Sequence, residues 1–256
     1  MASRIVMKFG GAALKTVADL LACVYLIMKN RKRYDEIVVV TSAMGDTTAQ
    51  LHQLAQEVAL QPDQREVDML ISVGERISMS LMAMALKSRG VDAISFTGSQ
   101  SGIITCPLHG EARIVDVKPV RILRELEKKR VVIVAGFQGV SQGEVTTLGR
   151  SGSDTTAVAL GAALSAERVI FYKDVAGVFS EDPKINERAE FFEELNYENA
   201  LKIVMKGEVL TQRSIKLAYA NQLPLYVTSF VNPHLGTKIQ DLSLKKKSEI
   251  QYESLL

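Results

Sequence analysis

The chain has 256 residues, enough to bury a sizeable core in one large α/β domain or in two small ones. Hydrophobic residues make up 47% of the sequence and charged residues 23%, which is ordinary for a soluble globular protein. Lys and Arg number 31 against 29 Asp and Glu, and this near-balance argues against a nucleic-acid-binding surface.

Signals for export, membrane insertion or a structural metal are not apparent in the sequence. Cys23 and Cys106 form neither a CxxC pair nor a zinc spacing, which favours a reducing compartment and no structural metal. A strand begins close to the N-terminus, with no signal peptide or apolar run of membrane-spanning length. We therefore expect a soluble cytoplasmic protein, in which the run 245–247 (KKK) belongs to a solvated tail.

In the first half of the chain, buried strands and helices alternate. Strands are expected at 4–9 and 37–41, and helices at 17–29, 49–59 and 67–87, the last ending before Gly90. The loops after the two strands contain Gly10-Gly11 and the polar run 42–48.

The second half continues the pattern, with strands expected at 93–97, 131–134, 169–172 and 225–228 and a helix at 155–164. The glycine-rich stretch 136–145 predicts a hairpin or flap. Alternation of strands and helices is typical of βαβ units and of a mostly parallel sheet covered on both faces. We expect one α/β domain over 1–240 and a tail over 241–256.

Polar loops follow several of these strands. Ligands of such sheets bind at the carboxyl ends of the strands, where Gly10-Gly11, the run 42–48 and Lys173-Asp174 are expected to meet. Adjacent glycines beside Lys8 can cradle phosphate, although a Gly-Gly pair is as often a simple tight turn. Neither a P-loop nor a dinucleotide fingerprint is present, so a nucleotide enzyme here needs another architecture.

The loop 146–156 (TTLGRSGSDTT) is the most informative segment. It opens a helix, with Ser153 or Asp154 as the expected N-cap, and a helix N-terminus attracts anions. Arg150 could bind a carboxylate and Asp154 an ammonium, so one loop could hold a zwitterion. The plainer alternative is a Gly/Ser loop with a surface Arg–Asp pair.

Glu75 stands in an otherwise apolar helical pattern and would be costly to bury without a partner. A bound ammonium is one such partner and a structural Arg is the alternative. The three histidines, His52, His109 and His234, are expected to have structural roles.

Taken together, seven segments resemble successive motifs of the aspartokinases, in the same order and at similar spacing, from the first strand to about Thr237. They are 8–11 (KFGG), 38–48 (VVVTSAMGDTT), 73–78 (VGERIS), 96–102 (FTGSQSG), 136–139 (GFQG), the loop 146–156, and 173–184 (KDVAGVFSEDPK).

The resemblance implies the amino acid kinase fold, a three-layer αβα sandwich that transfers the γ-phosphoryl group of ATP to the β-carboxylate of L-aspartate, as in the first step of the aspartate-family amino acid pathway that leads to lysine. It also implies Mg²⁺, small-molecule partners and a possible homodimer. The implied ATP-binding residues are Lys8, Gly10, Gly11, Lys173, Asp174, Phe179 and Lys184. The implied substrate-binding residues are Ser42, Thr47, Thr48, Glu75, Arg150, Ser153 and Asp154, with Lys8 and Asp154 as the catalytic pair.

That chemistry needs no general base. An aspartate side chain, with a pKa of about 3.9, is already an anionic nucleophile at neutral pH. The catalyst must bring two anions together in line and neutralise charge on the transferred group, which Lys8, glycine N–H groups and Mg²⁺ can do.

The sequence departs from the family pattern in three places. Ala12 and Ala13 replace the usual hydroxyl residues after Gly-Gly, and Glu208 stands near a usual phosphate-binding Lys, where it would repel phosphate. Lys206 or Lys173 could supply the missing charge, and Glu208→Ala is expected not to lower ATP affinity. The sequence also ends where ACT regulatory domains usually follow, so we expect no ACT-based feedback.

Two alternatives stay open. The same fold could phosphorylate another acidic acceptor, or the chain could be a nucleotide-binding homologue that has lost turnover.

Overall fold

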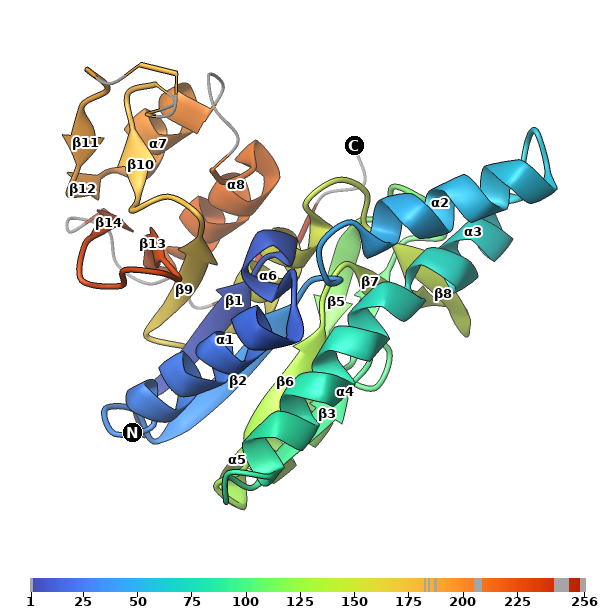
Figure 1. The fold of residues 1–256 in the computed structure, drawn as a ribbon, viewed down its shortest axis with the longest axis horizontal. Helices are drawn as coiled ribbons and strands as arrows, with labels where there is room; N and C mark the ends of the chain where they lie inside the picture. Colours follow the sequence, from blue (N-terminus) through green and yellow to red (C-terminus); the bar gives the residue numbers. More distant parts are fainter. Residues whose placement is uncertain are drawn as a thin grey trace.

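The centre of the molecule is an eight-stranded sheet in the order β12-β14-β13-β9-β1-β2-β6-β3, and β13–β14 is its only antiparallel pair among the described residues (Figure 1). The computed structural model describes residues 2–181, 183, 185–186, 188–204, 209–241 and 249–253. The strands of this sheet are β1 (Arg4–Phe9), β2 (Glu36–Thr41), β3 (Ala93–Phe96), β6 (Val131–Ala135), β9 (Arg168–Lys173), β12 (Glu194–Leu195), β13 (Leu225–Ser229) and β14 (Gly236–Ile239).

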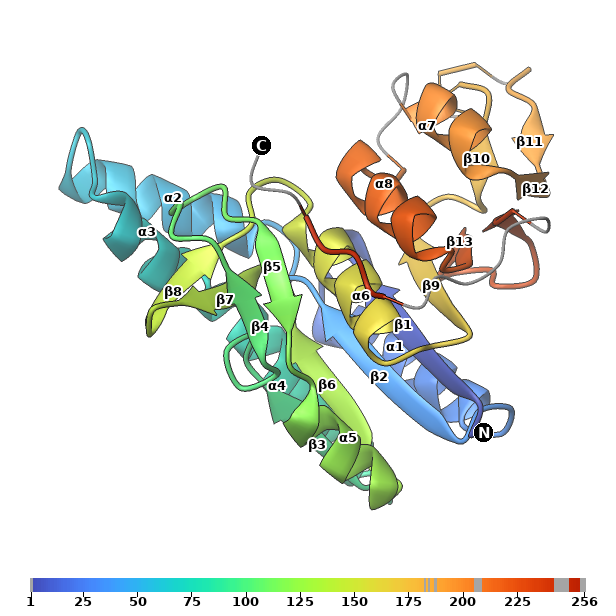
Figure 2. The same ribbon diagram turned by 180° about the vertical axis from the view of Figure 1, so that it is seen from behind.

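Helices cover both faces of this sheet. Helices α1 (Val17–Asn30) and α4 (Val73–Lys87) lie on one face, and α5 (Val120–Glu127), α6 (Gly152–Ala163) and α8 (Gln212–Asn221) lie on the other (Figures 1 and 2). Helices α2 (Thr47–Val58), α3 (Gln64–Ile71) and α7 (Tyr197–Val204) lie towards the ends of the molecule. The predicted αβα sandwich with a mostly parallel sheet is confirmed.

Strand β1 shows why the sheet is buried on both sides. Ile5, Met7 and Phe9 pack into the core beneath α1 and α4, whereas Val6 belongs to the core around α6. Because successive side chains of a strand point to opposite faces, Lys8 shares the α6 side with Val6. Strand β1 therefore places the buried cation of Lys8 in the layer that contains α6.

A second sheet orders its strands β5-β4-β7-β8, and a short pair joins β10 to β11. These strands are β4 (Ile103–Thr105), β5 (Ile114–Val117), β7 (Gln138–Ser141), β8 (Glu144–Thr147), β10 (Val178–Phe179) and β11 (Phe191–Phe192). The hairpin predicted at 136–145 is confirmed as β7–β8, but it belongs to a sheet and is not an isolated flap.

Two local predictions were wrong. The pattern predicted as one helix over 67–87 is two, because the chain turns at Ser72, which ends α3 and begins α4. Helix α6 begins at Gly152 with Ser151 as its N-cap, in the left-handed region at φ 56°, so Ser153 and Asp154 lie in the first turn.

The segment Gln64–Lys87 also bears on the expectation that no apolar run reaches membrane-spanning length. By length and composition alone this segment qualifies, but half of its most apolar window is buried inside the fold. A core helix of a globular protein has the same properties, so the segment is weak evidence for a membrane span.

Candidate active site

A buried cluster of three charges lies at the carboxyl ends of the two central strands β1 and β9. Asp154 Oδ1 is 2.6 Å from Lys8 Nζ, and Lys173 Nζ donates to Asp154 Oδ2 at 2.9 Å. Asp154 is 2% exposed and Lys8 is 4% exposed. Two cations facing one carboxylate leave a net positive charge in a site that water barely reaches.

Burial shifts the pKa of both partners. Desolvation lowers the pKa of Lys8, with the Lys173 cation acting in the same direction and Asp154 opposing. For Asp154, desolvation alone would raise the pKa, but the Lys173 and Lys8 cations outweigh it and hold the pKa below its usual value. The carboxylate therefore stays an anion, and a second anion nearby would stabilise the charged form of Lys8.

The fold brings the three residues together from distant parts of the sequence. Strands β1 and β9 pair in parallel with Lys8 opposite Phe171, so both lysines reach the same sheet edge. Gly136 follows β6 directly, and an added Cβ there would lie 2.8 Å from Ser153 Cβ. The bare backbone of Gly136 thus lets the first turn of α6, which carries Asp154, approach the sheet.

A cavity of about 1000 Å³ lies beside this cluster. Its lining includes six of the residues predicted to contact substrate or phosphate: Gly11, Ser42, Thr48, Glu75, Arg150 and Ser153. A volume of this size suits a small molecule together with part of a second one. The convergence of these loops, expected from the sequence, is therefore present in the fold.

Glu75 lies in the first turn of α4 and reaches this cavity with one satisfied and one unsatisfied oxygen. Its Oε1 accepts from the Ala43 N–H at 2.9 Å, whereas Oε2 is buried without a hydrogen-bond partner among the described residues. Desolvation raises the pKa of Glu75 to about 7, although the Ala43 N–H opposes the shift. A buried, unpaired carboxylate oxygen on a cavity wall fits a cationic ligand.

Gly74 sets the distance between α4 and the loop after β2. An added Cβ at Gly74 would lie 2.8 Å from Ala43 Cβ, too close for the present backbone. On the other side of the loop, the Gly45 N–H donates to the Gly11 carbonyl at 3.2 Å. Loop 42–46 is thus held between the glycine turn after β1 and the start of α4.

The N-terminus of α6 also faces the cavity. Gly149, Arg150, Ser151, Gly152 and Ser153 all contribute to its lining. Ser151 makes no side-chain capping bond, and the Gly152 and Asp154 N–H groups donate to the Gly149 and Ser151 carbonyls at 3.0 Å. The Arg150 cation and the positive end of the helix dipole together favour an anionic group at this wall.

Several predicted site residues do not line this cavity. Thr47 does not line the cavity, and its hydroxyl donates to the Met44 carbonyl at 2.6 Å. Phe179, on β10, packs against Phe191 with ring centroids 5.2 Å apart, and Asp174 is exposed just after β9. Lys184, Lys206 and Glu208 lie outside the described residues, so the predictions on them stay untested.

Sequence reasoning missed three residues near the cavity. His52 and His109 line it, although both were expected to be structural. His109 Nδ1 lies 2.8 Å from Oδ2 of Asp68, a fully buried carboxylate that also accepts from the Gly110 and Thr147 N–H groups. Asp68 falls in the same apolar pattern as Glu75, so the argument that singled out Glu75 would have found it too.

No group of three or more His, Cys, Asp or Glu side chains within the described residues is placed to hold a metal ion. The cluster and cavity offer cations together with the carboxylates of Asp154, Glu75 and Glu111, which suit anionic ligands and an ammonium.

Comparison with known proteins adds relatives that share this fold. An aspartokinase of Corynebacterium glutamicum is 47% identical over 92% of the chain and 56% of its own length. The crystal structure of an aspartate kinase from Synechocystis superposes with a TM-score of 0.84 at 36% identity, covering 97% of this chain and 42% of that one. Escherichia coli aspartokinase III in complex with aspartate and ADP gives a TM-score of 0.83 at 23% identity, over 94% of this chain and 66% of that one.

The chain spans about half the length of the curated relatives it matches. The family model described as the amino acid kinase family matches residues 3–229, which include both lysines, the carboxylate between them and the whole cavity lining. The chain belongs to the amino acid kinase family.

Proposed function

We propose that this protein transfers the γ-phosphoryl group of ATP to the β-carboxylate of L-aspartate, giving 4-phospho-L-aspartate. The observation that carries the proposal is that one cavity contains both an unpartnered carboxylate oxygen and a source of positive charge. Glu75 presents a buried, unpartnered carboxylate oxygen, while Arg150 and the α6 N-terminus present positive charge. An α-amino acid supplies an ammonium for the first and a carboxylate for the second.

The proposed roles follow from charge. Glu75 holds the substrate ammonium, and Arg150 with Ser153 holds the α-carboxylate. The β-carboxylate of the substrate then points towards Lys8. Lys8 and Lys173 lie within reach of incoming phosphate oxygens, and Asp154 orients both ammonium groups. Since the substrate carboxylate is already ionised, these groups only need to bring two anions together and stabilise charge on the transferred group.

ATP suits the residues at this sheet edge. An added Cβ at Gly10 would lie 3.4 Å from Lys8 Nζ, so the glycine keeps space beside that ammonium. Gly10, Gly11 and Lys173-Asp174 are the proposed phosphate-side residues and Phe179 the proposed base-side residue. Mg²⁺ at nucleotide sites is held by phosphate oxygens, water and one or two carboxylates, and when bound it neutralises phosphate charge. Asp174 is the proposed carboxylate, since both oxygens of Asp154 face lysines.

The aspartokinase relatives support aspartate over another acidic acceptor and support an active enzyme over a non-catalytic homologue. Consistent with those relatives, we also propose a cytoplasmic location and a place at the start of aspartate-family amino acid synthesis, including lysine.

The test is ADP release with Mg-ATP in the presence of L-aspartate, L-glutamate, N-acetylglutamate or no acceptor, with hydroxylamine to trap an acyl phosphate. We expect aspartate-dependent turnover and hydroxamate formation. Arg150→Gln is expected to raise the KM for aspartate about tenfold or more by loss of a charge-assisted bond, whereas Arg124→Gln, on the exposed face of α5, leaves it unchanged. ATP binding without turnover on any acceptor would contradict the proposal.

A further inference from the structure

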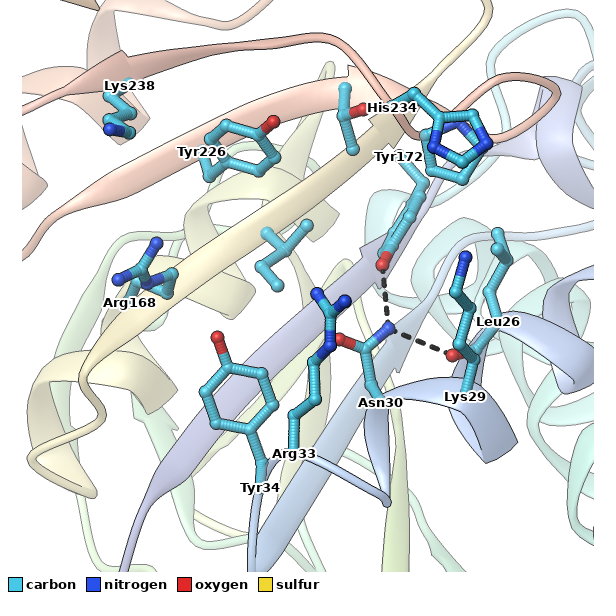
Figure 3. Close-up of a pocket in the computed structure, with 13 residues that line it drawn as sticks. Leu26, Lys29, Asn30, Arg33, Tyr34, Arg168, Tyr172, Tyr226, His234 and Lys238 are labelled. Carbon is cyan, nitrogen blue, oxygen red and sulfur yellow. Dashed lines mark hydrogen bonds between the residues drawn. The ribbon is translucent and has the colours of Figure 1, made fainter.

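A second cavity, of about 410 Å³, is drawn in Figure 3. It lies on the sheet face that α1 covers, opposite α6. It occupies the sheet surface next to the C-terminal end of α1, above β9, β13 and β14. Its 13 lining residues include none that line the cavity of the candidate active site.

The floor of this second cavity follows from strand alternation. Arg168, Ile170 and Tyr172 are alternate residues of β9 and point to the same face of the sheet. Tyr226 of β13 lies opposite Ile170 on one side and opposite Lys238 of β14 on the other. This apolar and aromatic surface is edged by the cations of Arg168 on β9 and Lys238 on β14.

The rim of the second cavity is strongly cationic. Its charged residues are Lys29, Arg33, Arg168 and Lys238, with His234 beside them, and no Asp or Glu is among the lining residues. Within the described part of the chain, no ion pair is formed by any of these four cations. Like charges gathered without a counter-charge repel one another, and a bound anion relieves that repulsion.

Arg168 distinguishes this cavity from an ordinary solvated basic surface. Its Nε is buried and has no hydrogen-bond partner among the described residues. A buried guanidinium N–H without an acceptor is unfavourable. The donor lies in the wall of a cavity, where a ligand oxygen can satisfy it.

We propose that this cavity, above β9 and β13, binds a phosphate-bearing small molecule at a site separate from the candidate active site. Arg33 and Arg168 supply planar forks that match phosphate oxygens, and Lys29 and Lys238 add point charges. The half-buried rings of Tyr34 and Tyr226 offer surface for the rest of the ligand, and the volume lies within the range of small-molecule pockets, about 300–1000 Å³.

Tyr172 connects this cavity to the middle of the fold. Its hydroxyl accepts from Asn30 Nδ2 at 3.1 Å (Figure 3), and its ring stacks on Phe9 with centroids 4.7 Å apart. Burial raises the pKa of Tyr172 to about 12, so its O–H stays a neutral donor. The Tyr172 hydroxyl therefore adds a neutral donor to the cationic donors around the cavity.

The three histidines allow a test that separates the two cavities. His234 lines this site, whereas His52 and His109 line the candidate active site. We would titrate inorganic pyrophosphate at constant ionic strength and follow the three imidazole ring resonances by NMR, with His234→Gln to assign the one in this cavity. Saturable movement of the His234 resonance is expected, whatever happens to the other two.

Variants then test the donors. Arg168→Gln and Arg33→Gln are each expected to weaken the pyrophosphate dependence of the His234 resonance by about tenfold or more. Lys32→Gln removes an adjacent exposed charge that does not line the cavity, and it should leave the dependence unchanged. Arg33 is exposed, so its substitution keeps the test valid if Arg168→Gln impairs folding, which circular dichroism would reveal.

Two results would overturn the proposal. One is a His234 resonance that does not move, or that moves without saturating. The other is equal weakening by Lys32→Gln, which would mean a general surface charge effect. Either result would leave the proposed kinase activity untouched, because that activity is measured at the other cavity.

Discussion

At the scale of single residues, Asp154 is the centre of the buried charge cluster. It neutralises two lysines that would otherwise face each other across a site with little water. Removing one partner of a buried ion pair is far more harmful than removing both, since an unpaired charge is left behind.

Asp154→Asn is therefore expected to destabilise the protein by about 3 kcal/mol or more, because two cations then lack a counter-charge. Lys8→Met leaves the neutral pair of Asp154 with Lys173 and should cost markedly less. Urea unfolding of the two variants, followed by circular dichroism, measures the difference. Equal destabilisation would show that the carboxylate is not balancing both lysines.

Glu75 gives the second residue-scale prediction, on pH. Its pKa rises from 4.5 to about 7 on folding, so between these values the folded protein holds a proton that the unfolded chain has lost. The free energy of unfolding of the ligand-free protein should thus fall by up to about 3 kcal/mol from this group as pH rises from about 4.5 to about 7. Glu75→Gln cannot titrate and should lack this slope, which unfolding curves at several pH values would reveal.

At the scale of elements, the contact between α4 and loop 42–46 depends on one glycine. Gly74→Ala improves helix propensity by about 1 kcal/mol, yet its new methyl meets Ala43 Cβ at 2.8 Å. The loop must move away, and it carries Ser42 and the Ala43 N–H that binds Glu75.

The expected result of Gly74→Ala is a KM for aspartate raised about tenfold with a smaller change in kcat. The double variant Gly74→Ala with Ala43→Gly removes the clash and should restore KM, which steady-state kinetics checks. If the double variant behaves like Gly74→Ala alone, then the contact with Ala43 is not the cause.

The elements also show what a sequence can predict. Strands β1, β2, β6, β9 and β13 were predicted because burial on both faces requires continuous apolar runs, and their bounds agree within a residue. The short strands β4, β5, β10 and β11 were not, since their half-buried sequences have no such run. The break at Ser72 was missed because the apolar pattern continues through it.

The candidate site was predictable to a similar degree. Glu75 was found because a carboxylate in an apolar helix is costly to bury without a partner. Arg150 was found because it is a cation in a glycine-rich loop. The ion pairing of Asp154 with Lys8 and Lys173 was not foreseen, because it depends on the sheet order that places β9 beside β1. The left-handed Ser151 likewise depends on tertiary packing and moved the start of α6.

At the scale of the whole molecule, stability is expected to be uneven. The central strands β1, β2 and β6 are buried along nearly their whole length, whereas β10 and β11 form a two-stranded sheet of mostly half-buried residues. Local opening follows the number of buried contacts. Amide hydrogen exchange should therefore be slowest in β1, β2 and β6 and at least about a hundredfold faster in β10–β11; comparable protection in both would contradict this account.

The raised pKa of Glu75 has a consequence for the protons exchanged when an amino acid binds. Burial favours the neutral carboxyl form, so near pH 7 part of the ligand-free protein carries a proton on Glu75. An ammonium arriving beside Glu75 would drive that proton off to the buffer. In calorimetric titrations near pH 7, the observed enthalpy of amino acid binding would therefore depend on the ionisation enthalpy of the buffer.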